Sequence, residues 1–175
     1  MSSANITIVK AEITDAAVLL EFSKATFFHF FGPLNDPANM EAYASVAFTS
    51  QKMLSELINP DSEFYFAMIG DEIAGYLKLN FSNAQTEFRE ADAMEIERIY
   101  VSQDHQRKKV GQQLLDFAIE TATNKKFKYV WLGVWENNHN ALAFYKHNDF
   151  EVFSSHEFVL GDDLQTDLLM KRLLN

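Results

Sequence analysis

The segment Glu95–Leu115 (EIERIYVSQDHQRKKVGQQLL) constrains the fold more than any other part of the chain. An apolar strand is predicted to end near Val101, and a basic loop leads from it into an amphipathic helix. Backbone N–H groups at such a loop and at a helix N-terminus point toward phosphate oxygens. Arg107, Lys108 and Lys109 place three positive charges there in a chain of net charge −10. The segment therefore predicts a diphosphate-binding turn between a strand and a helix.

The composition narrows the class of protein. With 175 residues, 47% of them hydrophobic, the chain has the size of one domain, which we expect to span residues 1–175. The 25 Asp and Glu residues outnumber the 15 Lys and Arg residues. This balance argues against nucleic acid as a partner and suits a cationic small molecule, although it is also common as a means of solubility. There is no cysteine, which excludes disulfides, thiolate metal sites and a cysteine nucleophile.

No feature of the sequence predicts a membrane or a metal partner. No apolar run reaches the ~18 residues of a membrane span, and the N-terminal MSSANITIVK lacks a signal-peptide pattern. We therefore expect a cytoplasmic protein. The five histidines show no metal-ligand spacing, so no metal is expected.

Periodicity and turn signals predict the other elements. Residues 27–36 are aromatic, contain Gly-Pro and Asp-Pro, and are expected to form a loop, as are residues 82–91. Residues 128–135 form an unbroken apolar run, which indicates burial on both faces as in a parallel strand pair. Strands are expected at 6–9, 63–68, 72–81, 94–101, 128–135, 150–160 and 166–173, and helices at 14–28, 40–57, 110–123 and 138–147. The order predicts an α/β fold with one mixed sheet.

Two motifs in this order carry a family resemblance. Gln106–Gly111 (QRKKVG) is similar to the pattern Q/R-x-x-G-x-G/A, and Asn138–Phe150 (NHNALAFYKHNDF) is similar to N-x-x-A-x-x-x-Y-x-x-x-G-F. Together they resemble the GNAT superfamily of acyl-CoA-dependent N-acyltransferases. The resemblance implies a single-domain, mostly antiparallel central sheet with a splayed parallel strand pair, flanked by helices. The sequence departs from the family at Lys109 and Asp149, where the patterns have glycine.

The resemblance also implies a reaction. Acetyl-CoA would be the cosubstrate and a primary amine the acceptor. The stretches ERIYV, WLGVWENN, ALAFYK and LGDDLQTDLLMK look like those of PaiA-type bacterial spermidine/spermine acetyltransferases, which favours a polyamine. An acetyltransferase acting on protein N-termini or lysines, and a non-catalytic CoA-binding regulator, remain as alternatives. Because family members are often dimers, a homodimer also remains open.

The implied reaction needs a base that takes a proton from the amine and an acid that protonates the thiolate. A primary amine has a pKa of about 10.4, so at pH 7 only about 1 in 10³ is free base. By resemblance, Tyr145 protonates the departing thiolate; the alternative is a half-buried helix aromatic. Glu95 and Glu97 lie two residues apart on one strand, so we expect them to share a face and offer a base. The alternative is that they are solvated or pair with Arg98.

The resemblance assigns the cofactor mostly to backbone atoms. The strand end is expected to bond the pantetheine amides and the basic loop to wrap the diphosphate. Asn138 is the usual side-chain partner of the cofactor arm, although it is equally suited to cap the following helix. The predicted cofactor-binding residues are Ile99, Tyr100, Val101, Gln106, Arg107, Lys108, Lys109, Val110, Gly111, Gln112, Asn138, Phe144, Tyr145 and Lys146.

The amine-binding wall is expected in the aromatic segment Phe27–Phe31. Its rings, with Asp36 or Glu41, are suited to hold an ammonium by cation–π and charge contacts. Core packing is the alternative for at least half of these rings.

Overall fold

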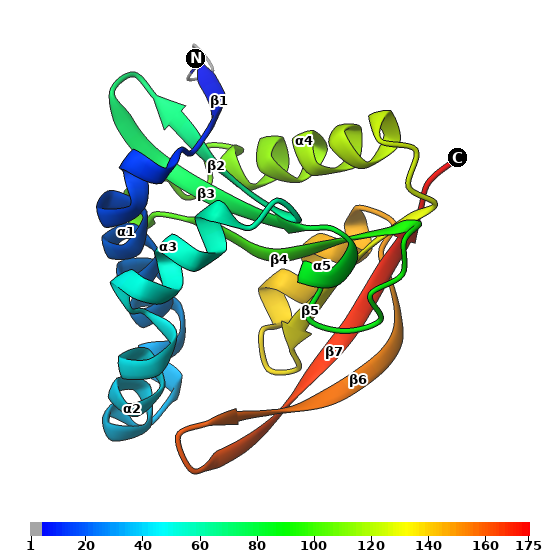
Figure 1. Cartoon of the computed structure of the whole chain (residues 1–175). Coiled ribbons are helices and arrows are strands. Elements are labelled where there is room, and N and C mark those ends of the chain that lie inside the picture. Colours follow the sequence, from blue (N-terminus) through cyan, green and yellow to red (C-terminus); the bar gives the residue numbers. More distant parts are fainter. Residues whose placement is uncertain (1–4) are drawn as a thin grey trace.

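The computed structural model describes residues 5–175, which form a seven-stranded sheet with helices on both faces (Figure 1). The strand order is β1-β2-β3-β4-β5-β7-β6. The strands are β1 (Ile6–Lys10), β2 (Ser62–Ile69), β3 (Glu72–Asn80), β4 (Ala93–Val101), β5 (Tyr129–Trp135), β6 (Glu151–Leu160) and β7 (Asp163–Leu173). The helices are α1 (Ala16–Phe31), α2 (Pro37–Ala47), α3 (Ser50–Ile58), α4 (Val110–Asn124) and α5 (His139–His147).

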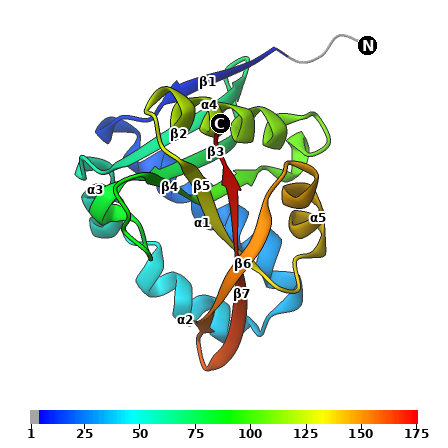
Figure 2. The same ribbon diagram turned by 90° about the vertical axis from the view of Figure 1, so that its right-hand side faces the viewer.

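The two faces of the sheet bury different side chains, because successive residues of a strand point to opposite faces. On one face, Leu77 and Ile96 pack with Leu114 of α4 in the largest apolar cluster. On the other face, Tyr76 packs with Leu19 of α1 and a methionine of α3. Figures 1 and 2 show α1 to α3 as one layer and α4 on the opposite side of the sheet. Over residues 5–175, no helix combines the length and apolarity that a bilayer span needs.

One strand pair is parallel, and it is short. The other neighbours in the sheet are antiparallel, whereas β4 and β5 run parallel and pair only from Ala93–Tyr129 to Glu95–Trp131. Beyond Glu95 the two strands diverge, although β4 stays paired with β3 as far as Val101. The predicted mixed sheet with a splayed parallel pair is confirmed.

Two expectations for the N-terminal half are wrong. The aromatic segment predicted as a loop from residue 27 is helical to Phe31, and a short 3-10 turn at Gly32–Leu34 follows it. The single helix predicted at 40–57 is two helices that break at Phe48 and Thr49. Thr49 caps α3 by accepting a hydrogen bond from the Lys52 N–H at 3.2 Å. The Phe48 ring meanwhile packs into an aromatic cluster at the helix junction, so tertiary packing sets both boundaries.

The β6–β7 hairpin reaches across to α2 and closes one end of the sheet face (Figures 1 and 2). The Asn39 amide donates to Asp162 at 2.7 Å, and the Asp162 N–H donates back to Asn39 at 3.3 Å. Gly161 has a φ of +65°, and a Cβ there would lie 2.3 Å from Asn39 Oδ1. The hairpin tip is thus fitted to α2 at a position that requires glycine.

Gly75 tests the packing of β3 against β4 and α4. A Cβ at Gly75 would lie 2.7 Å from the Tyr100 carbonyl oxygen and 3.2 Å from side chains of α4. We expect Gly75→Ala to lower the free energy of unfolding by about 1–3 kcal/mol, since backbone and core would have to shift. Chemical denaturation measures the change.

The matched control is Gly32→Ala, where a Cβ would meet no atom within 4 Å and φ is −57°. We expect it to leave the unfolding midpoint unchanged or slightly raised. Equal midpoints for the two variants would contradict this description of the β3–β4 contact.

Candidate active site

The basic loop after β4 presents free backbone N–H groups. The first intrahelical bond of α4 is donated by the Gln113 N–H to the Lys109 carbonyl at 3.0 Å. The N–H groups of Val110, Gly111 and Gln112 therefore have no acceptor within the helix. A Cβ on Gly111 would touch only Val101, at 3.6 Å, so the loop is open to a ligand there. This arrangement suits an anion such as a diphosphate.

Lys109 and Asp149 stand where the family patterns have glycine, and both keep the left-handed backbone conformation that glycine readily adopts. Lys109 has a φ of 65°, and Asp149 also has a φ of 65°. A left-handed conformation costs a residue such as lysine about 1–2 kcal/mol, so the turn is retained at some expense of stability. The side chains of Arg107, Lys108 and Lys109 are exposed, and none forms an ion pair with the described part of the chain.

The end of β4 carries backbone groups that face the gap left by β5. The Ser102 N–H donates to the Ala74 carbonyl at 2.9 Å, which fixes the alternation along the strand. Tyr100 therefore directs its backbone groups to β3, and Ile99 and Val101 direct theirs away from β3. Such an open strand edge fits the extended, amide-bearing arm of coenzyme A.

The side chains predicted to border the cofactor arm lie around α5. Asn138 caps this helix by accepting a hydrogen bond from the Ala141 N–H at 3.2 Å. The Gln112 amide donates to Asn148 at 2.8 Å and ties α4 to the end of α5, so its backbone N–H rather than its side chain faces the loop. Phe144 is half-buried and Lys146 is exposed.

Tyr145 lies on α5 beside the gap between β4 and β5. It is 7% exposed, and its ring packs against Phe144 and Phe150. Its hydroxyl forms no hydrogen bond with residues 5–175. Burial raises the pKa of Tyr145, and the neighbouring Tyr100 raises it further. Tyr145 therefore remains protonated at neutral pH and can donate its proton to a nearby thiolate.

Glu95 is buried, and both of its carboxylate oxygens accept hydrogen bonds. One carboxylate oxygen accepts from the Thr86 hydroxyl at 2.5 Å, and the other accepts from the Thr86 N–H at 2.8 Å and the Asn80 amide at 3.0 Å. Burial raises the pKa of Glu95, while these hydrogen bonds oppose the rise. The Asn80 amide also donates to Glu97 at 2.6 Å, so the two glutamates do lie on one side of the sheet.

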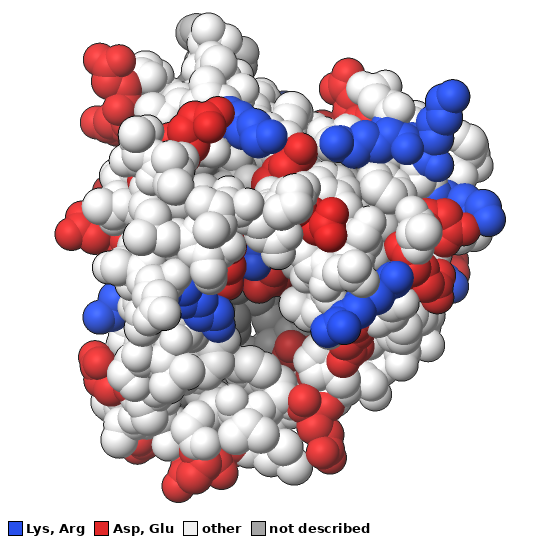
Figure 3. All heavy atoms as spheres, viewed as in Figure 1, with Lys and Arg blue, Asp and Glu red and all other residues white. Residues whose placement is uncertain are grey.

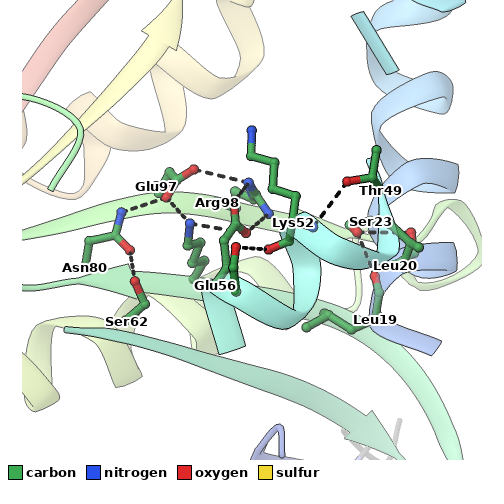
Figure 4. A network of polar contacts seen from close by, with 12 residues as sticks. Leu19, Leu20, Ser23, Thr49, Lys52, Glu56, Ser62, Asn80, Glu97 and Arg98 are labelled. Carbon is green, nitrogen blue, oxygen red and sulfur yellow. Dashed lines mark hydrogen bonds and ion pairs between the residues drawn. The ribbon is translucent and has the colours of Figure 1, made fainter. Parts of the chain in front are cut away.

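Glu97 belongs to a buried ion-pair network (Figure 4). It pairs with Lys78 and, at 3.3 Å, with Arg98. Glu56 of α3 accepts two hydrogen bonds from the Arg98 guanidinium, at 3.1 and 3.2 Å, and lies 3.4 Å from Lys78. Burial opposes the charge on Glu97, but Arg98, Lys78 and the Asn80 amide together lower its pKa to about 2. Glu97 is therefore a weak base.

A bulge in β4 gathers these charges on one face. Lys78 lies opposite Arg98, whereas the next residue, Leu79, lies opposite Ile96. The extra residue on β4 is Glu97. In a strand without a bulge, Arg98 would point to the face opposite Glu97. Here both contact Lys78 or Glu56 on the side of α3.

Comparison with known proteins agrees with this geometry. The family model for Acetyltransferase (GNAT) matches residues 24–150, which is most of the chain. An N-acetyltransferase of Lactobacillus delbrueckii subsp. lactis, itself uncharacterized, is 40% identical over 169 residues that cover 97% of this chain and 98% of the relative. The chain belongs to the GNAT acetyltransferase family. It is an acetyl-CoA-dependent N-acetyltransferase.

More distant relatives share the fold of this acetyltransferase. A spermidine N(1)-acetyltransferase of Thermoplasma acidophilum is 24% identical over 152 residues, covering 85% of the chain and 89% of the relative. The crystal structure of a PaiA N-acetyltransferase from Thermoplasma acidophilum with coenzyme A superposes with a TM-score of 0.78 at 22% identity, covering 97% and 99% of the two chains. A GCN5-related N-acetyltransferase from Rhodopseudomonas palustris gives a TM-score of 0.79 at 17% identity, covering 99% of each chain.

The aromatic segment of the acetyltransferase divides between core and cleft. Phe27 is 8% exposed and lies in the aromatic cluster beneath α2. Phe30 reaches Tyr100, with ring centroids 5.7 Å apart, and Phe31 reaches Trp135 at 6.1 Å. These last rings extend toward the ends of β4 and β5, as expected for an acceptor wall.

The carboxylates proposed for that wall lie elsewhere. Asp36 caps α2 by accepting hydrogen bonds from the N–H groups of Ala38, at 2.9 Å, and Asn39, at 3.2 Å. Glu41 is exposed on the same helix. A helix cap holds Asp36 in place, so it is not free to follow an ammonium.

Two acidic side chains that the sequence did not indicate meet at one histidine. Asp167 of β7 lies opposite His156 of β6, and the loop before β4 brings Glu87 to the same ring. The face in Figure 3 is hollowed near its centre, and charged atoms lie in and beside the hollow. The signal was an aspartate inside an apolar strand, in the stretch QTDLLM.

The ion-pair network predicts an acid-dependent loss of stability. The pKa of Glu97 is about 2 in the folded chain against 4.5 for a free side chain. A lowered pKa stabilises the fold above pH 4.5, and this contribution is lost as pH falls from 4.5 toward 2. We expect Glu97→Gln to cost on the order of 3 kcal/mol at pH 7. Denaturation from pH 7 to pH 2 should show the difference from wild type shrinking with acid.

Glu41→Gln, at an exposed carboxylate, is the control and should change stability little at any pH. A Glu97→Gln penalty that stays constant down to pH 2 would show that the carboxylate is not held ionised by its partners.

Proposed function

We propose that this acetyltransferase, acting as one domain over residues 1–175, acetylates a primary amine of a small polycation such as spermidine or spermine. The observation that carries the proposal is the charge on the acceptor side of the sheet. Within the ion-pair network, the positive charges of Lys78 and Arg98 balance the negative charges of Glu56 and Glu97. The carboxylates of Glu95, Asp167 and Glu87 remain, and among the described side chains only a histidine offers them a basic partner. This surplus of negative charge suits an ammonium.

Tyrosine rings complete a site for a cation. Burial raises the pKa values of Tyr43 and Tyr100; Arg98 opposes the rise, and the charges of Glu97 and Asp167 add to it. Both hydroxyls are therefore neutral, and their rings can contact an ammonium. A hollow of about 470 Å³ at the end of β5 is lined by Trp135, Glu136 and Asp163, among others, and offers room near further acidic groups.

The contact between the tip of the β6–β7 hairpin and α2 favours a slender acceptor over a folded protein. Asn39 and Asp162 join α2 to the tip of the β6–β7 hairpin by two hydrogen bonds. A peptide acceptor would favour an open groove across this face of the sheet. The contact between the hairpin and α2 closes one end of that face (Figure 2). The relative that carries the name spermidine N(1)-acetyltransferase adds weight to a polyamine.

The chain's residues have separate tasks in this reaction. Acetyl-CoA supplies a thioester carbonyl that an amine attacks. The N–H groups at the start of α4 would hold its diphosphate, and the backbone of Ile99 and Val101 would align its pantetheine arm. Tyr145, neutral and without a hydrogen-bond partner among residues 5–175, would protonate the departing thiolate.

The direct test is release of coenzyme A from acetyl-CoA in the presence of spermidine, spermine, shorter diamines, monoamines and lysine-bearing peptides. We expect polyamines to give a kcat/KM at least tenfold above that of peptides, because several ammonium groups can meet the carboxylates at once. Preferential turnover of peptides would contradict the polyamine assignment. Tight acetyl-CoA binding without turnover of any amine would contradict its catalytic role.

Removing the Tyr145 hydroxyl tests the acid. We expect Tyr145→Phe to lower kcat at least tenfold, since the thiolate would leave without a proton donor, and to leave the affinity for acetyl-CoA within about threefold. Steady-state kinetics and calorimetry separate the two effects. Tyr129→Phe, at a tyrosine that bonds Glu90 on the molecular surface, is the control. An unchanged kcat for Tyr145→Phe would exclude this role.

A further inference from the structure

The acceptor ammonium must lose a proton, and neither glutamate of β4 is free to take it. Both oxygens of Glu95 already accept hydrogen bonds from Thr86 and Asn80. Glu97 is bound by Lys78, Arg98 and Asn80, which stabilise its ionised form. Glu97 therefore has little tendency to accept a proton, and Glu95 has no oxygen free to meet the ammonium. The proton acceptor is therefore to be sought elsewhere on the same face.

Asp167 is a carboxylate with spare hydrogen-bonding capacity in the cleft. Its side chain is 21% exposed, and its ion-pair partner within residues 5–175 is His156, whose Nε2 lies 3.5 Å from Asp167 Oδ2. On the adjacent strand β5, Gly133 has no side chain to cover this spot. A Cβ there would lie 3.9 Å from Asp167 Oδ2 and 4.0 Å from His156 Cε1. The carboxylate thus borders space that a substrate nitrogen can enter.

His156 connects Asp167 to the outside of the molecule. Its Nδ1 lies 3.0 Å from Oε1 of Glu87, although the two are not aligned as a hydrogen bond, and this nitrogen is otherwise buried without a partner. Glu87 is 33% exposed. The ring therefore has one nitrogen toward the cleft carboxylate and the other toward a carboxylate that water can reach. On β5, Gly133 lies beside the ring and carries no charge.

The charge of Asp167 affects Tyr100, which in turn affects the proposed acid Tyr145. Burial is the main cause of the raised pKa of Tyr100, and the charge of Asp167 contributes to it. Tyr100 in turn raises the pKa of Tyr145. Burial also raises the pKa of Asp167, which makes it a better proton acceptor than Glu97, while His156 opposes that rise.

We propose that Asp167 accepts the proton of the acceptor ammonium and that His156 relays it to Glu87 and solvent. The inference rests on the proposed function, because it requires a protonated amine as acceptor. It assigns a reacting role to Asp167 and His156, which lie beside Gly133, and to Glu87, which lies next to the His156 ring.

An N–H bond of the ammonium breaks and its proton passes to Asp167 Oδ2, while the electron pair stays on nitrogen and forms the bond to the thioester carbonyl carbon. The C–S bond then breaks. The sulfur takes a proton from the Tyr145 hydroxyl, which regains one from the substrate nitrogen. Asp167 then passes its proton to Nε2 of His156, a proton leaves Nδ1 toward Glu87 and water, and proton exchange with solvent returns the ring to its starting tautomer before the next turnover. One proton is released in each turnover.

The test compares pH profiles of Asp167→Asn and His156→Gln with wild type from pH 6 to pH 10. The acceptor is whichever primary amine the wild type acetylates best, so a loss of polyamine preference and a failure of the relay are separate results. We expect both variants to lose at least tenfold in kcat at pH 7. The loss should shrink toward pH 10, where free amine is abundant, and acetyl-CoA affinity should change less than threefold.

Asp71→Asn and His147→Gln, at exposed positions away from the cleft, are the matched controls and should keep the wild-type profile. Profiles of Asp167→Asn and His156→Gln that run parallel to wild type, whether lowered or not, would overturn the proposal. Should Asp167→Asn fail to fold, the profile of His156→Gln decides, because a purely structural histidine would not give a defect that high pH repairs.

Discussion

The divergence of β4 from β5 is the constraint on which the rest of the site depends. The two strands pair over three residue positions and then separate, although β4 continues alongside β3. Backbone groups of Ile99 and Val101 are left facing a gap, and backbone groups away from water need a partner. Tyr145 borders this gap on one side, and α4 begins at its end with N–H groups free. A cosubstrate with amides and a diphosphate satisfies both sets of groups.

The buried charges keep that open strand in place. Removing one partner from a buried ion pair typically costs 3–5 kcal/mol, roughly, so such a network resists rearrangement. Glu56 extends from α3 to Arg98 and Lys78, and thereby ties the helical layer that covers the acceptor to the bulged part of β4. The Ser62 hydroxyl donates to the side-chain Oδ1 of Asn80 at 2.9 Å, which orients the Asn80 amide nitrogen toward Glu95 and Glu97. The same contacts that stabilise the strand hold Glu97 in its ionised form and occupy both carboxylate oxygens of Glu95.

Local patterns made most of the fold predictable, and tertiary contacts account for what was missed. Alternating apolar residues and turn signals located the seven strands, and the motif around Lys109 located the turn into α4. The extension of α1 to Phe31 and the break at Thr49 were hidden, because aromatic packing between helices decides them. Residues 166–173 were predicted as a strand, but β7 begins three residues earlier, at Asp163, opposite Leu160.

The carboxylate of Asp36, expected in the acceptor wall, proved to be a helix cap. Asp167 and His156 are eleven residues apart in sequence and meet only through the pairing of β6 with β7.

A crystal structure of the complex with coenzyme A would test the central claim most directly. We expect pantetheine amides hydrogen-bonded to the backbone of Ile99 and Val101. We also expect diphosphate oxygens within hydrogen-bonding distance of the N–H groups of Val110, Gly111 and Gln112. Coenzyme A bound outside the gap between β4 and β5, or a complex in which the two strands are zipped together beyond Glu95, would contradict it.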